Sequence, residues 1–219
     1  MADNARKKKG GDFNHRRAIG GLWDVMGPMQ ISFLQSRGMR PEDYLVDIGA
    51  GSLRLGCHAI PFLDPGHYFA FDQNADLLKA GWHKELDDAS RARTPRHHLR
   101  QIEDFDFSFL PCRMTFGMAQ SVFTHTPFNL LRRCLRNAEP HFARGGQLFV
   151  TYFLCPDEYR LEEPMEHPPG KVVTFDHKNP YHYRQSDLHY AAAETRWRAE
   201  LVPEWKHPRG QDMVAYTLR

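Results

Sequence analysis

The sequence predicts an α/β protein with a mostly parallel sheet of seven strands, helices on both faces and an antiparallel strand at the end. Short apolar segments alternate with segments of helical periodicity from residue 44 onward. The first of them, residues 44–48, runs directly into a glycine turn, as a strand buried on both faces of a parallel sheet does. Two closing apolar segments joined by a loop indicate an antiparallel pair.

Composition and charge limit the classes of protein that the chain can represent. Its 219 residues fit one domain, with 41% apolar and 26% charged residues and a net charge of +2. That balance lacks the broad basic surface of a nucleic-acid-binding protein. No apolar stretch approaches the ~18 residues of a membrane span, and no secretory signal is evident. We therefore expect neither a nucleic-acid nor a membrane partner, and the sequence indicates no oligomeric state.

The cysteines and histidines give a second limit. The four cysteines are scattered without a C-x-x-C pair, which favours a reduced, cytoplasmic protein. The thirteen histidines form no H-x-x-x-H pair with a nearby acid, so we expect no metal site.

The N-terminal region differs from the rest of the chain. Residues 1–12 contain a run of basic residues and are expected to be a disordered tail. Residues 13–43 are expected to form a helical lid, with one or two helices across 15–38 interrupted at Gly27-Pro28. Residues 44–219 then form the main domain.

The elements of that domain follow in order. Apolar, β-branched and aromatic runs predict strands at 44–48, 68–71, 97–102, 114–119, 147–153, 200–202 and 213–218. Capping residues and prolines predict helices from about Leu53 after the cap Ser52 and ending at Pro61, from the cap Asn74 to Leu86, from Thr126-Pro127 to Ala138, and from the cap Ser186 to about Arg196. Residues 155–185, rich in proline, acids and aromatics, form a long connection.

Ligands of open α/β sheets bind beyond the carboxyl ends of the strands. In this chain that rule selects four segments: Asp47 with Gly49 and Gly51, Asp72, Glu103-Asp104-Phe105, and residues 120–125. Two ligand classes compete for the glycine turn. A dinucleotide fingerprint requires a third glycine where this chain has Arg54. A nucleoside that carries an amino acid fits better, because an acid beside the turn serves its ammonium group.

These motifs, in this order, resemble the class I S-adenosylmethionine-dependent methyltransferases. The resemblance covers residues 44–154 well and residues 185–219 more loosely. Asp47-Ile48-Gly49-Ala50-Gly51 matches the first motif of that family, and Asp72 matches its ribose-binding acid. The chain departs from the family at Leu53, where a third glycine is common.

The resemblance implies a Rossmann-like methyltransferase fold, S-adenosyl-L-methionine as cofactor and a set of site residues. The implied cofactor-binding residues are Asp47, Gly49, Ala50, Gly51, Arg54, Asp72, Gln73, Asp104, Phe105, Gln120 and Ser121. The candidates for a catalytic base are His125, Tyr152 and His182, and residues 155–185 are expected to shape the substrate pocket. The expected reaction is methylation of a small molecule or sugar, with oxygen preferred as the acceptor atom by family frequency.

Several alternatives stay open at this stage. Arg54, in the first turn of a predicted helix, indicates a carboxylate partner, either in the cofactor or in the protein. Glu103 or Asp106 could take the place of Asp104, and His125 is either a structural loop residue or a general base. The alternative functions are a non-catalytic methyltransferase-like subunit, an NAD-dependent oxidoreductase, and a methyltransferase that acts on a nucleic acid or a protein.

Overall fold

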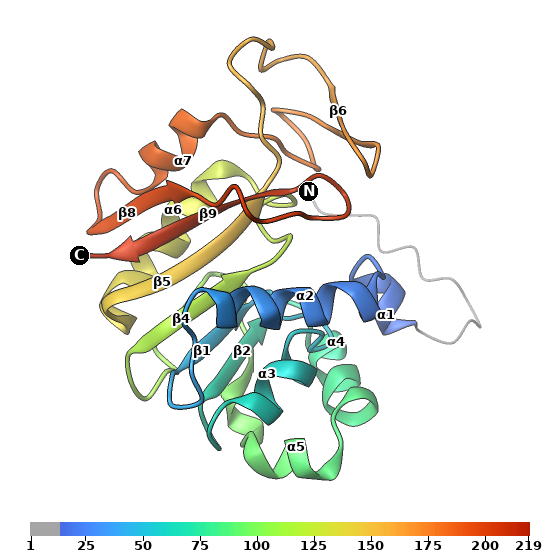
Figure 1. Cartoon of the computed structure of the whole chain (residues 1–219), viewed down its shortest axis with the longest axis vertical. Helices are drawn as coiled ribbons and strands as arrows, with labels where there is room; N and C mark the ends of the chain where they lie inside the picture. The colour runs from blue at the N-terminus through green and yellow to red at the C-terminus, as the bar shows by residue number, and fades with distance from the viewer. Residues whose placement is uncertain (1–13) are drawn as a thin grey trace.

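The sheet organises the whole molecule. The computed structural model describes residues 14–219, so the tail expected over residues 1–12 lies outside the described residues. The seven strands lie in the order β3-β2-β1-β4-β5-β9-β8, and β9 runs antiparallel to both of its neighbours (Figure 1). The strands are β1 (Leu45–Ile48), β2 (Tyr68–Asp72), β3 (Leu99–Gln101), β4 (Met114–Ala119), β5 (Phe142–Tyr152), β8 (Trp197–Leu201) and β9 (Asp212–Leu218). The predicted fold class is confirmed.

Two apolar clusters cover the two faces of the sheet. Because side chains alternate along a strand, Val46 and Ile48 contribute to one cluster and Leu45 to the other. The first cluster packs under α6 (Phe128–Ala138) and α7 (Gln185–Ala191). The second packs under α2 (Trp23–Ser36), α3 (Gly56–Phe62) and α4 (Ala75–Ala80). The central strands are therefore apolar at consecutive positions, as strands covered on both faces must be.

The N-terminal region contains α1 (His15–Ala18) and α2, and the predicted interruption at Gly27-Pro28 is wrong. Pro28 lies inside α2, on its exposed side, where the helix loses one backbone hydrogen bond but keeps its buried face. Gly27 lets α2 approach α3 closely, since a Cβ at this position would lie 2.6 Å from His58 Nε2.

The helix after the glycine turn also begins and ends differently from the prediction. α3 begins at Gly56 rather than Leu53, because Leu53 has a left-handed φ of 64° and cannot belong to a right-handed helix. Pro61 lies inside the last turn of α3, which ends at Phe62. The α4 helix begins as predicted, since the Asn74 side chain accepts hydrogen bonds from the backbone N–H groups of Asp76 and Leu77.

Other boundaries move by a few residues. Pro127 rather than Thr126 is the N-cap of α6, and the Thr126 hydroxyl donates instead to the Val122 carbonyl. Ser186 lies inside α7, whose first turn is held by Asp187 accepting from the Arg184 backbone N–H. Strand β5 begins five residues before the predicted strand because its ladder with β4 already starts at Phe142. A π-helix (Gly81–Glu85) extends α4.

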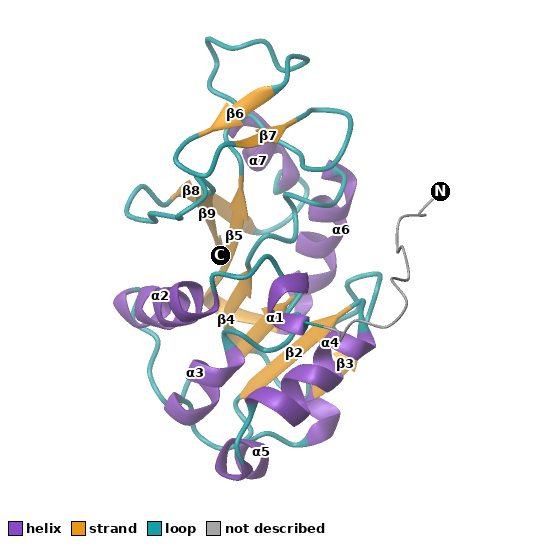
Figure 2. Cartoon of the chain, turned by 90° about the vertical axis from the view of Figure 1, so that its right-hand side faces the viewer, coloured by secondary structure: helices purple, strands orange, loops and turns teal. Residues whose placement is uncertain are grey.

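Residues that the sequence left without regular structure form further elements. The helix α5 (Asp88–Arg93) precedes β3, and the short strands β6 (Met165–His167) and β7 (Val172–Thr174) pair in the connection at 155–185. Figure 2 shows this small hairpin standing beyond the end of the main sheet. Within residues 14–219, no helix has the length and apolar character needed to cross a membrane.

A candidate cofactor and substrate cavity

A cavity of about 430 Å³ opens beyond the carboxyl ends of β1, β2 and β4. Its volume lies in the range of small-molecule sites. Segments far apart in the sequence line it: the glycine turn, the end of β2, the segment after β3, the loop after β4, the long connection and the N-terminal region. The residues on its wall that matter below are Ile19, Gly49, Gly51, Arg54, Asp72, Gln73, Glu103, Phe105, Gln120, Ser121, His125 and Asn179.

The glycine turn is enclosed on two sides. Gly49 has a φ of 66°, and a Cβ there would lie 2.5 Å from the Val122 side chain. Gly51 has a φ of 54°, and a Cβ there would lie 2.6 Å from the Ile19 side chain. Both the left-handed backbone and the close contacts therefore require glycine. Ala50 between them is buried and does not line the cavity.

Asp72 connects the glycine turn to the end of β2. Its side chain accepts from the backbone N–H of Gly51 at one oxygen and from that of Asn74 at the other, both at 2.8 Å. Burial raises the pKa of Asp72, and the two backbone hydrogen bonds oppose that shift. Each carboxylate oxygen keeps further acceptor capacity, so this carboxylate can also accept from ligand hydroxyl groups.

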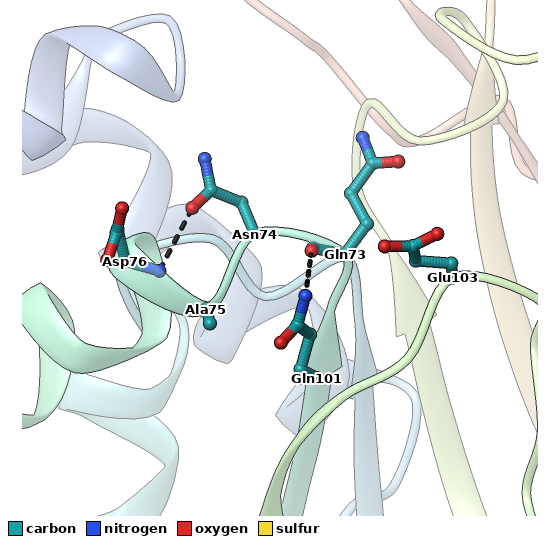
Figure 3. A pocket seen from close by; sticks show the side chains of 6 residues that line it. All are labelled: Gln73, Asn74, Ala75, Asp76, Gln101 and Glu103. Carbon is teal, nitrogen blue, oxygen red and sulfur yellow. Dashed lines mark hydrogen bonds between the residues drawn. The ribbon is translucent and has the colours of Figure 1, made fainter.

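A shallow hollow continues the cavity past Asp72 (Figure 3). It shares Gln73, Asn74 and Glu103 with the main cavity, and the Gln101 amide donates to the Gln73 carbonyl on its floor. The hollow is lined mainly by polar side chains, among them the Glu103 carboxylate. Such side chains can form hydrogen bonds with the hydroxyl and amino groups of a nucleoside.

The segment after β3 turns two predicted residues in different directions. Phe105 lines the cavity, and its ring stacks on Phe123 at a centroid distance of 5.6 Å. Asp104 does not line the cavity: its side chain is 62% exposed and lies 3.6 Å from Arg133. Glu103 lies on the cavity wall instead, so the structure favours Glu103 among the acids that the sequence left open.

Arg54 is the basic group of the cavity. Its guanidinium donates to the Gly21 carbonyl at 2.8 Å, and it forms no ion pair with any acid in residues 14–219. Burial lowers the pKa of Arg54 to about 10, so the group stays charged at neutral pH. Its remaining N–H groups are suited to an anionic group of a ligand.

Asp47 lies beneath the turn rather than on the cavity wall. Its carboxylate accepts from the Tyr68 hydroxyl at 2.7 Å, and its side chain is almost completely buried. Burial raises the pKa of Asp47 to about 7, although the Tyr68 hydrogen bond and the charge of Arg54 oppose the shift. Asp47, like Ala50 and Asp104, is therefore a predicted cofactor residue that does not line the cavity.

The loop after β4 brings in a residue that the sequence reasoning missed. Gln120 and Ser121 both donate to the Gln211 side-chain oxygen at 3.0 Å, and all three are partly or fully buried. Ser121 has a φ of 58°, and its backbone N–H donates to Thr151. Gln211 comes from the segment before β9, and no local sequence signal connects it to β4.

Of the three candidate bases, only His125 lines the cavity. Its Nδ1 lies 2.6 Å from Asn179 Oδ1, and Asn179 is also on the cavity wall. Tyr152 is buried in β5, and burial raises its pKa far above neutrality. His182 is buried beneath the β6–β7 hairpin, with hydrogen bonds to Thr174 and to the Leu161 carbonyl. The structure does not bring these three residues together.

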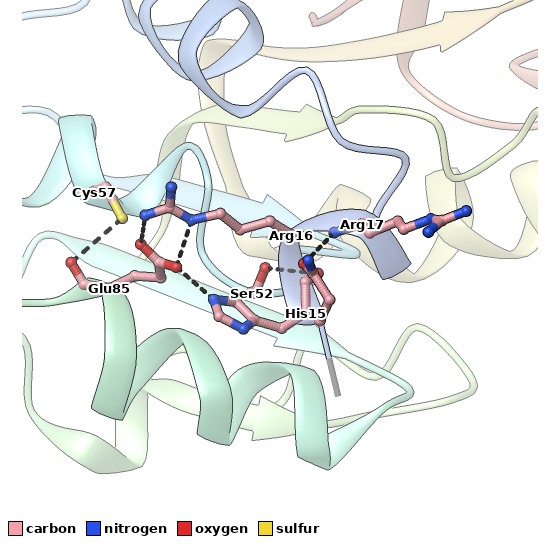
Figure 4. Close-up of polar contacts among 7 residues, drawn as sticks. His15, Arg16, Arg17, Ser52, Cys57 and Glu85 are labelled. Atoms are coloured by element: carbon pink, nitrogen blue, oxygen red, sulfur yellow. Dashed lines mark hydrogen bonds and ion pairs between the residues drawn. The ribbon is translucent and has the colours of Figure 1, made fainter. Parts of the chain in front are cut away.

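The N-terminal region covers part of the cavity. Ala18 and Ile19 lie on its wall, and polar contacts hold the preceding helix in place. His15 and Arg16 both bind the Glu85 carboxylate, and Ser52 donates to the His15 carbonyl at 3.4 Å (Figure 4). On the other side, Arg209 donates to the Gly20 carbonyl at 2.7 Å.

Comparisons with known proteins agree with this architecture. No protein-family profile matches the chain. Magnesium protoporphyrin IX methyltransferase (ChlM) from Synechocystis PCC 6803, solved with bound SAM, superposes with a TM-score of 0.62 at 10% identity, over 97% of this chain and 87% of that one. The amino pentose methyltransferase CalS10 from Micromonospora echinaspora gives 0.61 at 14% identity, over 93% and 94%. DesVI from Streptomyces venezuelae gives 0.59 at 18% identity, over 89% and 91%.

The fold is therefore that of the class I S-adenosylmethionine-dependent methyltransferases. The mostly parallel sheet of seven strands and its antiparallel β9 agree with this fold, as the sequence predicts.

Proposed function

We propose that this chain is an S-adenosylmethionine-dependent methyltransferase that acts on a small molecule or a sugar, with oxygen as the acceptor atom. The observation that carries the proposal is the grouping of the glycine turn, Arg54 and Asp72 on one cavity wall. Arg54 can bind an anion, Asp72 can bind hydroxyl groups, and the glycine turn lets a ligand come close to the backbone. Together they match a nucleoside that carries an amino acid.

Each side chain on the wall has a defined task in this proposal. Arg54 binds the carboxylate of the cofactor, and Asp72 accepts from the ribose hydroxyls. Phe105 packs against the adenine ring, and Glu103 accepts from the adenine amino group in place of Asp104. Ser121, together with Gln120, Gln73 and the glycine turn, contacts the rest of the cofactor.

When bound, the sulfonium supplies an activated methyl group, so the main task of the chain is to hold donor and acceptor in line. His125 is the residue that could take a proton from the acceptor, because it is the only predicted base on the cavity wall. Tyr152 and His182 are both buried and do not line the cavity, so neither takes a proton in this proposal.

The solved structures support the substrate class without naming the substrate. They include methyltransferases of magnesium protoporphyrin IX and of an amino pentose, and a glycopeptide N-methyltransferase. Another similar structure is a putative rRNA methylase from Clostridium thermocellum. The net charge of +2 favours a small acceptor over a nucleic acid.

We also propose that the protein works in a reducing compartment, because its four cysteines are unpaired.

Titration calorimetry with S-adenosylmethionine tests the cofactor assignment. The wild type is expected to bind, and Asp72→Ala to bind about 10-fold to 100-fold more weakly, since a hydrogen bond to a charged group contributes about 1.5–3 kcal/mol. Asp104→Ala is the matched control, because it removes an exposed carboxylate outside the cavity. Its affinity should equal that of the wild type.

Two outcomes would contradict the proposal. Equal affinity of the wild type and Asp72→Ala would remove Asp72 from the cofactor site. A wild type that binds NAD but not S-adenosylmethionine would instead support the oxidoreductase alternative. Thermal unfolding of each variant confirms that a lost affinity reflects the site and not the fold.

A further inference from the structure

The long connection at residues 155–185 is hydrogen-bonded to the loop after β4 that contains His125. The Tyr181 backbone N–H donates to the Thr124 carbonyl at 2.8 Å. The Tyr183 hydroxyl donates to the carbonyls of Phe123, at 3.1 Å, and Thr126, at 2.8 Å. The backbone on both sides of His125 is thus tied to residues 179–183, which brings Asn179 onto the same cavity wall.

The contact between Asn179 and His125 defines which ring nitrogen carries the proton. Asn179 Oδ1 is a carbonyl oxygen, which only accepts, so His125 Nδ1–H must be the donor across the 2.6 Å contact. In a neutral ring the other nitrogen, Nε2, then has a free lone pair. His125 Nε2 forms no hydrogen bond with any group in residues 14–219.

A second histidine of the same region has the opposite arrangement. His182 Nε2 lies 2.8 Å from the Leu161 carbonyl, so here Nε2 carries the proton. His182 Nδ1 then accepts from the Thr174 hydroxyl, also at 2.8 Å. Both nitrogens of His182 are occupied, whereas His125 keeps one nitrogen free at the cavity.

We propose that Asn179 is a positioning residue that holds His125 in the Nδ1–H tautomer, with Nε2 available as a proton acceptor for the methylated substrate. This inference rests on the proposed function and narrows its substrate class to acceptors that lose a proton, such as alcohols and phenols. The acceptor oxygen forms a bond to the methyl carbon while its proton passes to His125 Nε2. The bond between methyl and sulfur breaks, and its electron pair returns to the sulfur, which becomes neutral. The His125 imidazolium then releases its proton to water.

The test is the tautomer of His125, measured by long-range ¹⁵N–¹H NMR of histidine-labelled protein at about pH 8.5, which is about two units above the reference pKa of the imidazole group. The variant His125→Gln assigns the signals by their disappearance. We expect the wild type to show a protonated Nδ1 and a bare Nε2 at His125. Asn179→Ala should lose this pattern, and Asn179→Asp should keep it, because a carboxylate also accepts from Nδ1–H.

The signals of His182 are the internal control, since they report an intact connection and should stay in the Nε2–H form in every variant. A wild-type His125 protonated at Nε2, or a tautomer unchanged in Asn179→Ala, would overturn the inference. Calorimetry with S-adenosylhomocysteine separates the two proposals. If the wild type fails to bind it, the proposed function fails whatever the tautomer, whereas binding with the wrong tautomer refutes only the role of Asn179.

Discussion

The buried carboxyl group of Asp47 makes the stability of this fold depend on pH. Its carboxylate is buried beneath the glycine turn with only the Tyr68 hydroxyl as a close partner, and its pKa is raised from an ordinary 3.8 to about 7. Between these two values the folded protein holds a proton that the unfolded chain has released. Stability therefore falls as the pH rises through this window and levels off above the folded pKa.

The expected magnitude follows from the width of the window. One proton corresponds to ~1.4 kcal/mol per pH unit, so between about pH 5 and pH 8 the group removes about 3 kcal/mol of unfolding free energy. Asp47→Asn keeps an oxygen for the Tyr68 hydroxyl and cannot ionise. Its free energy of unfolding, relative to wild type, should therefore increase by about 3 kcal/mol over the same range.

Urea unfolding of both proteins at a series of pH values measures this difference directly. Tyr68→Phe is the matched control, because it removes the hydroxyl but keeps the ionisable carboxylate. That variant should be less stable than wild type and should still lose stability as the pH rises. If wild type and Asp47→Asn depend on pH in the same way, Asp47 is not a buried group with a raised pKa, and the reasoning fails.

Three further predictions concern the cavity. Gly49→Ala should lower the unfolding free energy by about 3 kcal/mol in urea unfolding, because it strains a left-handed backbone and meets Val122; adding Val122→Ala should recover part of the loss. In calorimetry, Arg54→Met should bind S-adenosylhomocysteine about 10-fold more weakly but 5′-methylthioadenosine, which lacks the carboxylate, with unchanged affinity; equal losses for both ligands would exclude a carboxylate contact. Glu103→Ala should lower the affinity for S-adenosylhomocysteine about 10-fold, while Asp104→Ala should leave it unchanged. A loss of affinity in Asp104→Ala alone would instead assign the adenine contact to Asp104.

The sheet was largely predictable from the sequence because its central strands are mostly apolar and are each followed by a glycine or a polar residue. β4 has the predicted bounds, and β1 and β2 differ by one residue at one end. Helix boundaries were less predictable. The left-handed backbone of Leu53 and the prolines inside α2 and α3 depend on packing that no local pattern reports.

Asp72 and Asp47 show that the sequence also predicts the site only in part. Asp72 is the last residue of β2, so its side chain reaches the glycine turn at the end of the sheet. Asp47 is the third residue of β1, inside the strand, and its side chain therefore faces one side of the sheet and meets Tyr68. Gln211 and Asn179 could not be predicted, because their places follow from long-range contacts.

The hydrogen bond between Arg209 and Gly20 joins residues 189 positions apart. During synthesis from the N-terminus, Gly20 leaves the ribosome long before its partner exists. Strand β9, which inserts between β5 and β8, is also made after the other strands of this sheet. A nascent chain that stops short of residue 209 lacks this bond, although the contacts of His15 and Arg16 with Glu85 and of Arg54 with Gly21 already hold the N-terminal region on one side. We expect residues 18–21 to be cut more readily by a protease in such a chain than in one that includes Arg209, because the part of the cavity wall that they form is then held from one side alone.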